Sequence, residues 1–340
     1  MMIDAKRYTS GRIAVTNLSA LIDSLELRRV EGATFENLLA LSGFLFFRGD
    51  LLGCIADHDR GELVATEAIA LSPGTGSAFY TRAWLAERFH RFEEANALLG
   101  QALAAGYPRR KIDAEKAALF QAMGQYTEAL VLRERLAKDD PGLHTVGALA
   151  SLLAEMERWA VAEDCYAAAL DADSGISPFP CGQLLFGWGV SAIRYGDLDR
   201  AEAIFADLDA ILPQHVPARG HRAQVALARG QLAAAVALIV PLIEISDDPE
   251  YRAIYAEILA ALDEREAAVT EAERAAAAYE LLLARRPEAY AEHAAAFFTG
   301  VGNRPQLAVD LASANWKLRD TPRSRRLLAQ ALHIAHPCEE

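Results

Sequence analysis

Small residues recur along this chain at a nearly constant spacing, and this spacing limits the folds that the chain can adopt. Each follows a short polar turn, and most lie three residues after an aromatic or aliphatic residue. The eight small residues are Cys54, Ala95, Ala129, Ala162, Ala201, Ala235, Ala268 and Ala308. The gaps between them are 41, 34, 33, 39, 34, 33 and 40 residues. A period near 34 residues predicts an array of similar units that bury their apolar faces against one another.

Other positions repeat in step with these small residues, and the segments between turns follow the period of an α-helix. The matching turn glycines are Gly49, Gly124, Gly196 and Gly230, and the matching terminal prolines are Pro73, Pro141, Pro213 and Pro287. Small residues in the first half of the units are Ala83, Ala117, Ala150, Gly189, Ala223 and Ala256. The pattern resembles the tetratricopeptide repeat, a helix–turn–helix unit, over roughly residues 34–320. The resemblance implies an all-α, right-handed α-solenoid of about eight units.

Solenoids need helices that cover their terminal apolar faces. We therefore expect residues 1–33 to form an arm and an N-terminal capping helix, with the solenoid over 34–320. Residues 321–340 are expected to form a C-terminal capping helix and a tail. Thr321 and Pro322 are typical of a helix start, and the arginines that follow are expected on the polar outer face.

Three of the gaps are too long for a 34-residue unit. The first and the last exceed it by about seven residues, and the terminal proline is late by the same amount. Because seven residues are about two helical turns, we expect the second helices over 51–71 and 264–285 to be two turns too long. The third excess falls in 171–182, which is rich in proline, glycine and serine and predicts a looped bend that exposes Cys181.

By resemblance to the family, the first helices of the units line a concave groove. The candidate groove residues are Phe46, Phe47, Tyr80, Trp84, Glu87, Arg88, Lys111, Gln121, His144, Phe186 and Arg194. Aromatic side chains beside arginine are typical of binding hot spots. The alternative is that the aromatics pack against the N-terminal helix or against neighbouring units. The lysine, asparagine and arginine clamp with which some family members hold a free carboxylate is missing from the first four units.

The charge and the hydropathy of the chain exclude several classes of function. A net charge of −13 argues against nucleic acid as the main partner. No apolar run approaches 18 residues and no secretory leader is recognisable, so we expect a cytoplasmic protein with no membrane segment. Four scattered cysteines predict free thiols, and those at Cys54 and Cys165 are expected to be buried.

Few residues suggest catalysis or metal binding. His333, His336 and Cys338 are plausible metal ligands, but they lie on a terminal tail that is expected to fray. His58 and Glu62 are one helical turn apart, which fits a shared metal or a solvated helix face. The glycine-rich segments 72–78 and 299–305 lack the context of a phosphate loop and fit turns between units. We expect no metal and no cofactor, and the absence of a catalytic motif argues against an enzyme.

The sequence favours a non-catalytic scaffold that binds a protein or peptide in its groove. One alternative is a sensor of a peptide or small molecule. Another is an enzyme or accessory protein of a biosynthetic pathway with a pocket in the solenoid, for which His58, His90 and Glu93 are the only support. The sequence does not indicate the partner or the oligomeric state.

Overall fold

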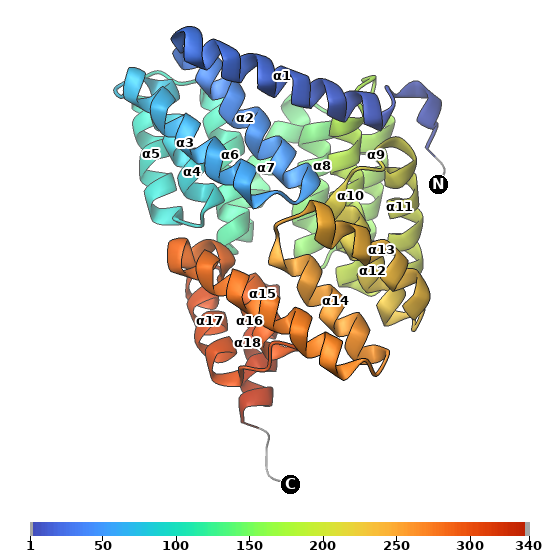
Figure 1. Ribbon diagram of the computed structural model, residues 1–340. Helices are drawn as coiled ribbons and strands as arrows, with labels where there is room; N and C mark the ends of the chain where they lie inside the picture. The colour runs from blue at the N-terminus through green and yellow to red at the C-terminus, as the bar shows by residue number, and fades with distance from the viewer. Residues whose placement is uncertain (1–2, 337–340) are drawn as a thin grey trace.

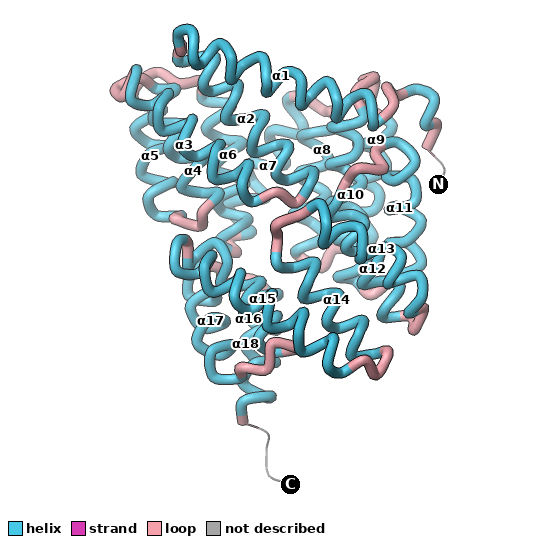
Figure 2. Tube along the Cα trace, in the orientation of Figure 1, coloured by secondary structure: helices cyan, strands magenta, loops and turns pink. Residues whose placement is uncertain are grey.

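The computed structural model describes residues 3–336, and every regular element within that range is helical (Figure 2). Eight pairs of helices follow one another, and each pair is one of the predicted units (Figure 1). The first four pairs are α2 (Phe35–Leu52) with α3 (Ile55–Leu71), α4 (Gly76–Arg88) with α5 (Phe92–Ala104), α6 (Arg109–Met123) with α7 (Tyr126–Asp139), and α8 (Leu143–Glu155) with α9 (Trp159–Asp171). The last four are α10 (Pro178–Tyr195) with α11 (Leu198–Ile211), α12 (Val216–Ala228) with α13 (Leu232–Ile245), α14 (Pro249–Ala261) with α15 (Arg265–Arg285), and α16 (Pro287–Thr299) with α17 (Pro305–Leu318).

Single helices cover the two ends of this array. A 3-10 helix, Ala5–Arg7, and helix α1 (Gly11–Gly32) precede the first pair, and α18 (Pro322–Ala335) follows the last. The Thr321 hydroxyl accepts a hydrogen bond from the Ser324 N–H, so the expected start of α18 is confirmed. The predicted all-α solenoid of eight units is also confirmed.

Each unit turns through a residue with a positive φ angle. Glycine supplies it in four units, at Gly53, Gly124, Gly196 and Gly230. In the other four units the same role falls to His90, Glu157, Asp263 and Asn303. A side chain in this conformation costs about 1–2 kcal/mol more than glycine, so packing around these turns must hold them in place.

The first unit has a different register from the predicted one. In the other seven units the recurring small residue is the fourth residue of the second helix, and in α3 that residue is His58 rather than Cys54. Gly49 lies inside α2, and Gly53 makes the turn. The two glycines are four residues apart, about one helical turn, so the sequence pattern did not separate them. A Cβ on Gly49 would lie 2.3 Å from the His58 ring, which explains the glycine there.

The three long gaps have different structural causes. Helix α15 has 21 residues against 13 or 14 in α5 and α7, so its two extra turns are confirmed. Helix α3 has only 17, so it gains about one turn, and the prediction of two was wrong. In the third gap a short connection leads to α10, which is itself lengthened to 18 residues. Cys181 is therefore buried in α10 instead of exposed in a loop. Cys54 and Cys165, which were expected to be buried, are partly exposed.

The superhelix completes a turn, so that the edge of the first units rests on the edge of the last ones (Figure 1). The Ser246 hydroxyl, between units six and seven, donates to the Gly53 carbonyl in the turn of unit one. In unit two, His90 Nδ1 lies 3.0 Å from the Glu288 carbonyl oxygen at the start of unit eight. In unit three, the Met123 carbonyl accepts from the Asp320 N–H at 3.2 Å. The partners in these three contacts are 193, 198 and 197 residues apart, so a similar offset is kept over three successive units.

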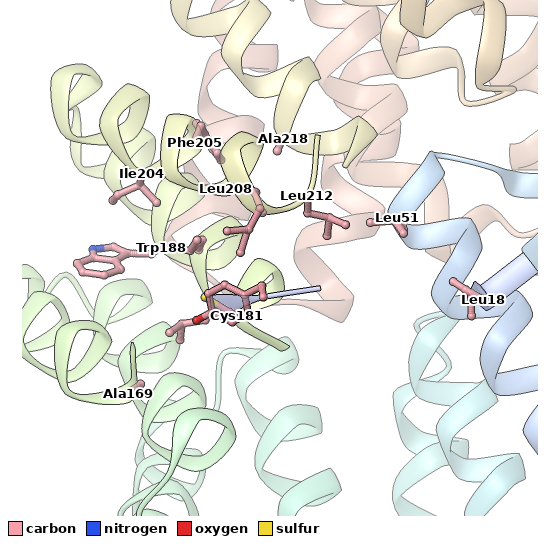
Figure 3. Packing of buried hydrophobic residues seen from close by; sticks show 14 of the residues in the cluster. Leu18, Leu51, Ala169, Cys181, Trp188, Ile204, Phe205, Leu208, Leu212 and Ala218 are labelled. Atoms are coloured by element: carbon pink, nitrogen blue, oxygen red, sulfur yellow. The ribbon is translucent and has the colours of Figure 1, made fainter. Parts of the chain in front are cut away.

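One hydrophobic cluster also connects the first unit to units four and five. One cluster of buried side chains includes Leu18 of α1, Leu51 of α2 and Leu212 after α11 (Figure 3). The N-terminal arm reaches the same region, where the Thr9 N–H donates to the Ile176 carbonyl at 2.8 Å. Helix α1 therefore braces unit five as well as covering unit one.

We expect Asp247→Ala to lower the thermal stability of the whole protein. The Asp247 carboxylate accepts hydrogen bonds from the N–H groups of Ile55 at 2.6 Å and Ala56 at 3.0 Å, and so caps α3 from across the closure. Losing a cap of this kind costs about 0.5–2 kcal/mol. Calorimetry should show a lower Tm, whereas Asp164→Ala, on an exposed face of α9, should stay within about 0.5 kcal/mol of wild type. An equal change in Tm for the two variants would show that the Asp247 cap does not contribute to the stability of the protein.

The revised register predicts very different costs for two adjacent phenylalanines. Phe46 is 1% exposed and packs on Gly61, where a Cβ would lie 2.8 Å from its ring, whereas Phe47 is half-buried. Phe46→Ala should lower the free energy of unfolding by about 3–5 kcal/mol. Phe47→Ala should cost clearly less in urea titrations, and small, equal costs for both variants would favour the register predicted from the sequence, in which both residues line the groove.

Candidate functional site

Two neighbouring cavities share part of their lining, the smaller one among units three to five and α18, and the larger one among units five to eight and α18. Their volumes are about 290 Å³ and 390 Å³, and Arg194, Arg323 and Arg326 line both. The first helices α10, α12, α14 and α16 form the floor of the larger one, and α18 closes its side. We refer to the two cavities together as the chamber. Its size falls in the range of small-molecule and short-peptide pockets.

One wall of the chamber carries four arginines, Arg194, Arg319, Arg323 and Arg326. Glu292, which is 3% exposed, pairs with both Arg319 at 2.8 Å and Arg323. Arg326 pairs with Glu157 at 3.0 Å. Because one carboxylate serves two guanidinium groups, this wall has more positive than negative charge.

Arg194 is the least well paired of these arginines. Its guanidinium lies 3.9 Å from the Glu155 carboxylate and makes no closer ion pair within the described residues. Glu155 is already hydrogen-bonded by Gln121 at 3.1 Å and by Tyr126 at 3.3 Å. Burial, and then the neighbouring Arg323, lower the pKa of Arg194 below its usual value, but a guanidinium stays charged at neutral pH. Its donors are therefore available to an anion in the chamber.

The part of the larger cavity that α14 lines is acidic. Glu250 and Glu257 of α14 line it together with His221 and His293. His293 Nδ1 lies 3.5 Å from Glu250, and His221 Nδ1 lies 2.8 Å from the Gln224 side chain. Burial, and then the charge of Glu250, raise the pKa of the Glu257 carboxyl. This wall favours a cation or a hydrogen-bond donor.

Aromatic side chains complete the smaller cavity. Tyr126, Trp159 and Tyr195 line it, and the rings of Trp159 and Tyr195 are stacked 5.0 Å apart. Such rings offer apolar surface with little loss of conformational entropy on binding. The chamber thus combines an apolar wall with charged groups of both signs.

Most of the predicted groove residues of the first two units are engaged with one another. Phe46 is buried, which excludes it as a groove residue, and its ring meets Trp84 edge-on at 4.8 Å. The Arg88 guanidinium lies over the Phe46 ring and binds Asp50. Trp84 itself is half-buried and does not pack on α1.

Tyr80 and Glu87 lie near a third ionisable group that the sequence did not single out. The Tyr80 hydroxyl donates to Glu115 at 3.2 Å, and its ring stacks on Tyr107 at 4.5 Å. Burial and the charge of Glu87 raise the pKa of Glu115 to about 7. Burial raises the pKa of Glu87 as well.

The remaining predicted residues lie in separate places. Lys111 and His144 are exposed and line a shallow cavity beside α6 and α8. Phe47 and Phe186 line another, between α2 and α10. Of the predicted set, only Arg194 lines the chamber, while Gln121 contacts it through Glu155.

The sequence analysis missed the other charged residues of the chamber. Glu250, Glu257 and His293 lie on the first helices of units seven and eight, so the repeat period could have indicated them if it had been extended to those units. The expectation that the arginines of α18 face outward was wrong for Arg323 and Arg326. They face inward because the closure of the superhelix places α18 against units four and five.

The other candidate sites do not assemble. His58 contacts Asp50 and Arg88, whereas Glu62 pairs with Arg286, so these two residues do not share a ligand. Among residues 3–336 no group of three or more His, Cys, Asp or Glu side chains is placed to hold a metal ion. The tail ligand set includes Cys338, which lies outside the described residues.

The residues proposed for an enzymatic pocket also have separate partners. His90 faces the Glu288 carbonyl and stacks on Phe92 at 5.2 Å, and Glu93 is exposed. No helix in the described part of the chain is both long and apolar enough to cross a membrane.

Comparisons with known proteins agree with the helical pairs. A family model described as "Tetratricopeptide repeat" matches residues 192–258, from the end of α10 to the last turn of α14. These residues are tetratricopeptide repeats, and the other units have the same paired-helix architecture. No curated protein sequence matches the chain. The match covers the units whose turn glycines and small residues are most regular, which explains why these units are detected.

Solved structures of low sequence identity have a similar fold, and two of them have a TM-score above 0.5. A Rap protein complexed with competence and sporulation factor is 14% identical with a TM-score of 0.54, and the alignment covers 94% of this chain and 98% of that one. The Cut9 and Hcn1 assembly of the APC/C is 13% identical, with a TM-score of 0.53 over 87% of this chain and 55% of that one. A tetratricopeptide repeat protein from Parabacteroides merdae is 19% identical, with a TM-score of 0.47 over 71% and 91%.

The raised pKa of Glu115 predicts a stability that depends on pH. The folded protein holds this proton to about pH 7, whereas an unfolded glutamic acid loses it near its ordinary value, about 4.3. Stability should therefore fall as pH rises between these values. Glu115→Gln should raise the Tm at pH 8 and change it little at pH 5. The Tm should be measured from pH 5 to pH 8, with Glu134→Gln at an exposed position as the control. The same profile for both variants would contradict the raised pKa of Glu115.

Proposed function

We propose that this protein is an interaction scaffold that binds a short peptide, or the end of a partner chain, in the chamber. The observation that carries the proposal is the chamber itself, which combines an apolar aromatic wall with incompletely paired charges on the concave face. Tetratricopeptide repeat arrays serve as interaction modules, and their concave surfaces are suited to extended ligands. The site differs from the groove expected in units one and two, where the aromatics pack on one another.

A second candidate is a sensor in which the ligand alters the closure of the superhelix. The observation that favours it is the position of the chamber, which is lined both by α10 in the middle of the chain and by α18 at its end. A ligand there would bridge the two and stabilise the closed form. The Rap protein of similar fold was solved with competence and sporulation factor bound, and its alignment extends over 94% of this chain.

A variant that fills the chamber tests the first proposal. Ala296 lines the larger cavity and is exposed within it, so Ala296→Trp should occupy the space without disturbing the core. Ala237→Trp, on an exposed position of the second helix α13, is the matched control. Peptides selected from a displayed random library on the wild-type protein should bind A296W about tenfold or more weakly and A237W unchanged.

Peptide affinity and thermal stability distinguish the scaffold proposal from the sensor proposal. Selected peptides that bind A296W and wild type equally well would place the site elsewhere and refute the chamber as the binding site. The sensor proposal requires in addition that such a peptide raises the Tm of the wild-type protein, since a ligand that binds only the native state must stabilise it. Unchanged hydrogen exchange at α18 upon binding would contradict the bridging role.

A further inference from the structure

Opposite charges line the same cavity without neutralising each other. Arg194 of α10 and Glu257 of α14 both border the larger cavity, of about 390 Å³. Helix α12 packs between α10 and α14 and keeps the two groups apart. Across α12, His221 and Gln224 bind each other rather than either charged group. The cavity therefore has a positive end and a negative end, separated by a neutral pair.

The positive end has donors that the protein does not use. Arg194 makes one ion pair, at 3.9 Å, to a Glu155 carboxylate that already accepts two neutral hydrogen bonds. Its neighbour Arg323 shares the single carboxylate of Glu292 with Arg319. A guanidinium held in this way offers a planar pair of N–H donors, which fits a carboxylate.

The negative end has acceptors that the protein does not use. Glu257 makes no ion pair or side-chain hydrogen bond with any other described residue, and a second acidic group, Glu250, lies two turns earlier on the same helix and lines the same cavity. Glu250 has only His293 at 3.5 Å. The charged forms of carboxyl groups in a partly buried wall are stabilised by a cation that binds nearby. An ammonium group has the charge and the donors for this position.

We propose that the chamber selects a dipolar ligand, namely a short peptide whose free carboxylate binds at Arg194 and whose free ammonium group binds at Glu257. This inference rests on the proposed peptide-binding function and specifies its ligand. The two charges come from the backbone ends, so the recognition is independent of side chains and sets the length of the peptide. It also differs from the clamp that is missing in the first four units, because it uses α10 and α14 of the last four.

The test uses tripeptides without charged side chains. Equimolar mixtures built from Ala, Leu, Ser and Phe are prepared with both ends free, with an amidated C-terminus, or with an acetylated N-terminus. Equilibrium dialysis against the full-length protein, read by mass spectrometry, gives the bound fraction of each mixture. A fourth mixture, acetylated but with lysine at the first position, distinguishes a side-chain amine from the terminal one. The variants are Arg194→Gln and Glu257→Gln, with the exposed Glu273→Gln as control.

The wild-type protein and E273Q should retain the free tripeptides and bind each blocked mixture about tenfold or more weakly. R194Q should lose the preference for the acid over the amide and keep the preference for the free amine. E257Q should show the opposite pattern, which a mere loss of folding cannot produce. Binding of blocked and free mixtures to the same extent would overturn the dipolar ligand while leaving peptide binding intact.

Failure to retain the free mixture would also overturn the inference. The proposed function then stands if the displayed library still yields peptides whose binding A296W abolishes, and it falls with the inference if the library yields none. Retention of the lysine mixture alone would assign the cationic end to a side chain and refute the role of the terminal amine.

Discussion

The contact between the edge of the first three units and the edge of the last ones determines most of what is distinctive in this structure. It consists of short-range polar contacts at turns, such as His90 with the Glu288 carbonyl and Met123 with the Asp320 amide. Each bond is modest by itself. Their common offset matters more, because it fixes the superhelical pitch, and the pitch decides which inner faces lie opposite each other.

The chamber is a consequence of that pitch. The closure places α18 across units four and five, and the arginines of α18 thereby meet the concave ends of α8 and α10. In an open superhelix Arg323 would lie far from Glu155 and Arg194. The charges that line the chamber come from helices that are distant in sequence, so they form a site only in the closed arrangement.

The repeated units could be predicted from the sequence because their signal is local. A small residue, a turn glycine and a period near 34 are set by how one helix crosses the next, and they recur in each unit. The error in unit one came from two glycines about one helical turn apart, Gly49 and Gly53, which fit the pattern equally well. The closure has no such local signal. Gly53 and Ser246 are 193 residues apart, and nothing near either residue indicates the other. The inward position of the α18 arginines was missed for the same reason, whereas the residues of α14 could have been found by extending the repeat period.

The Asp247 cap on α3 has a consequence for how the chain is made. Ile55 and its carboxylate partner are separated by 192 residues, so α3 emerges from the ribosome long before its cap exists. At ordinary rates of synthesis the interval is about 10 to 40 s. During that time the first units have only nearest-neighbour packing to hold them, as in a simple repeat array. Units six to eight are made last, and their contacts join the two edges of the array. A nascent chain whose synthesis stops before residue 247 therefore leaves the edge of the first units open to other partners.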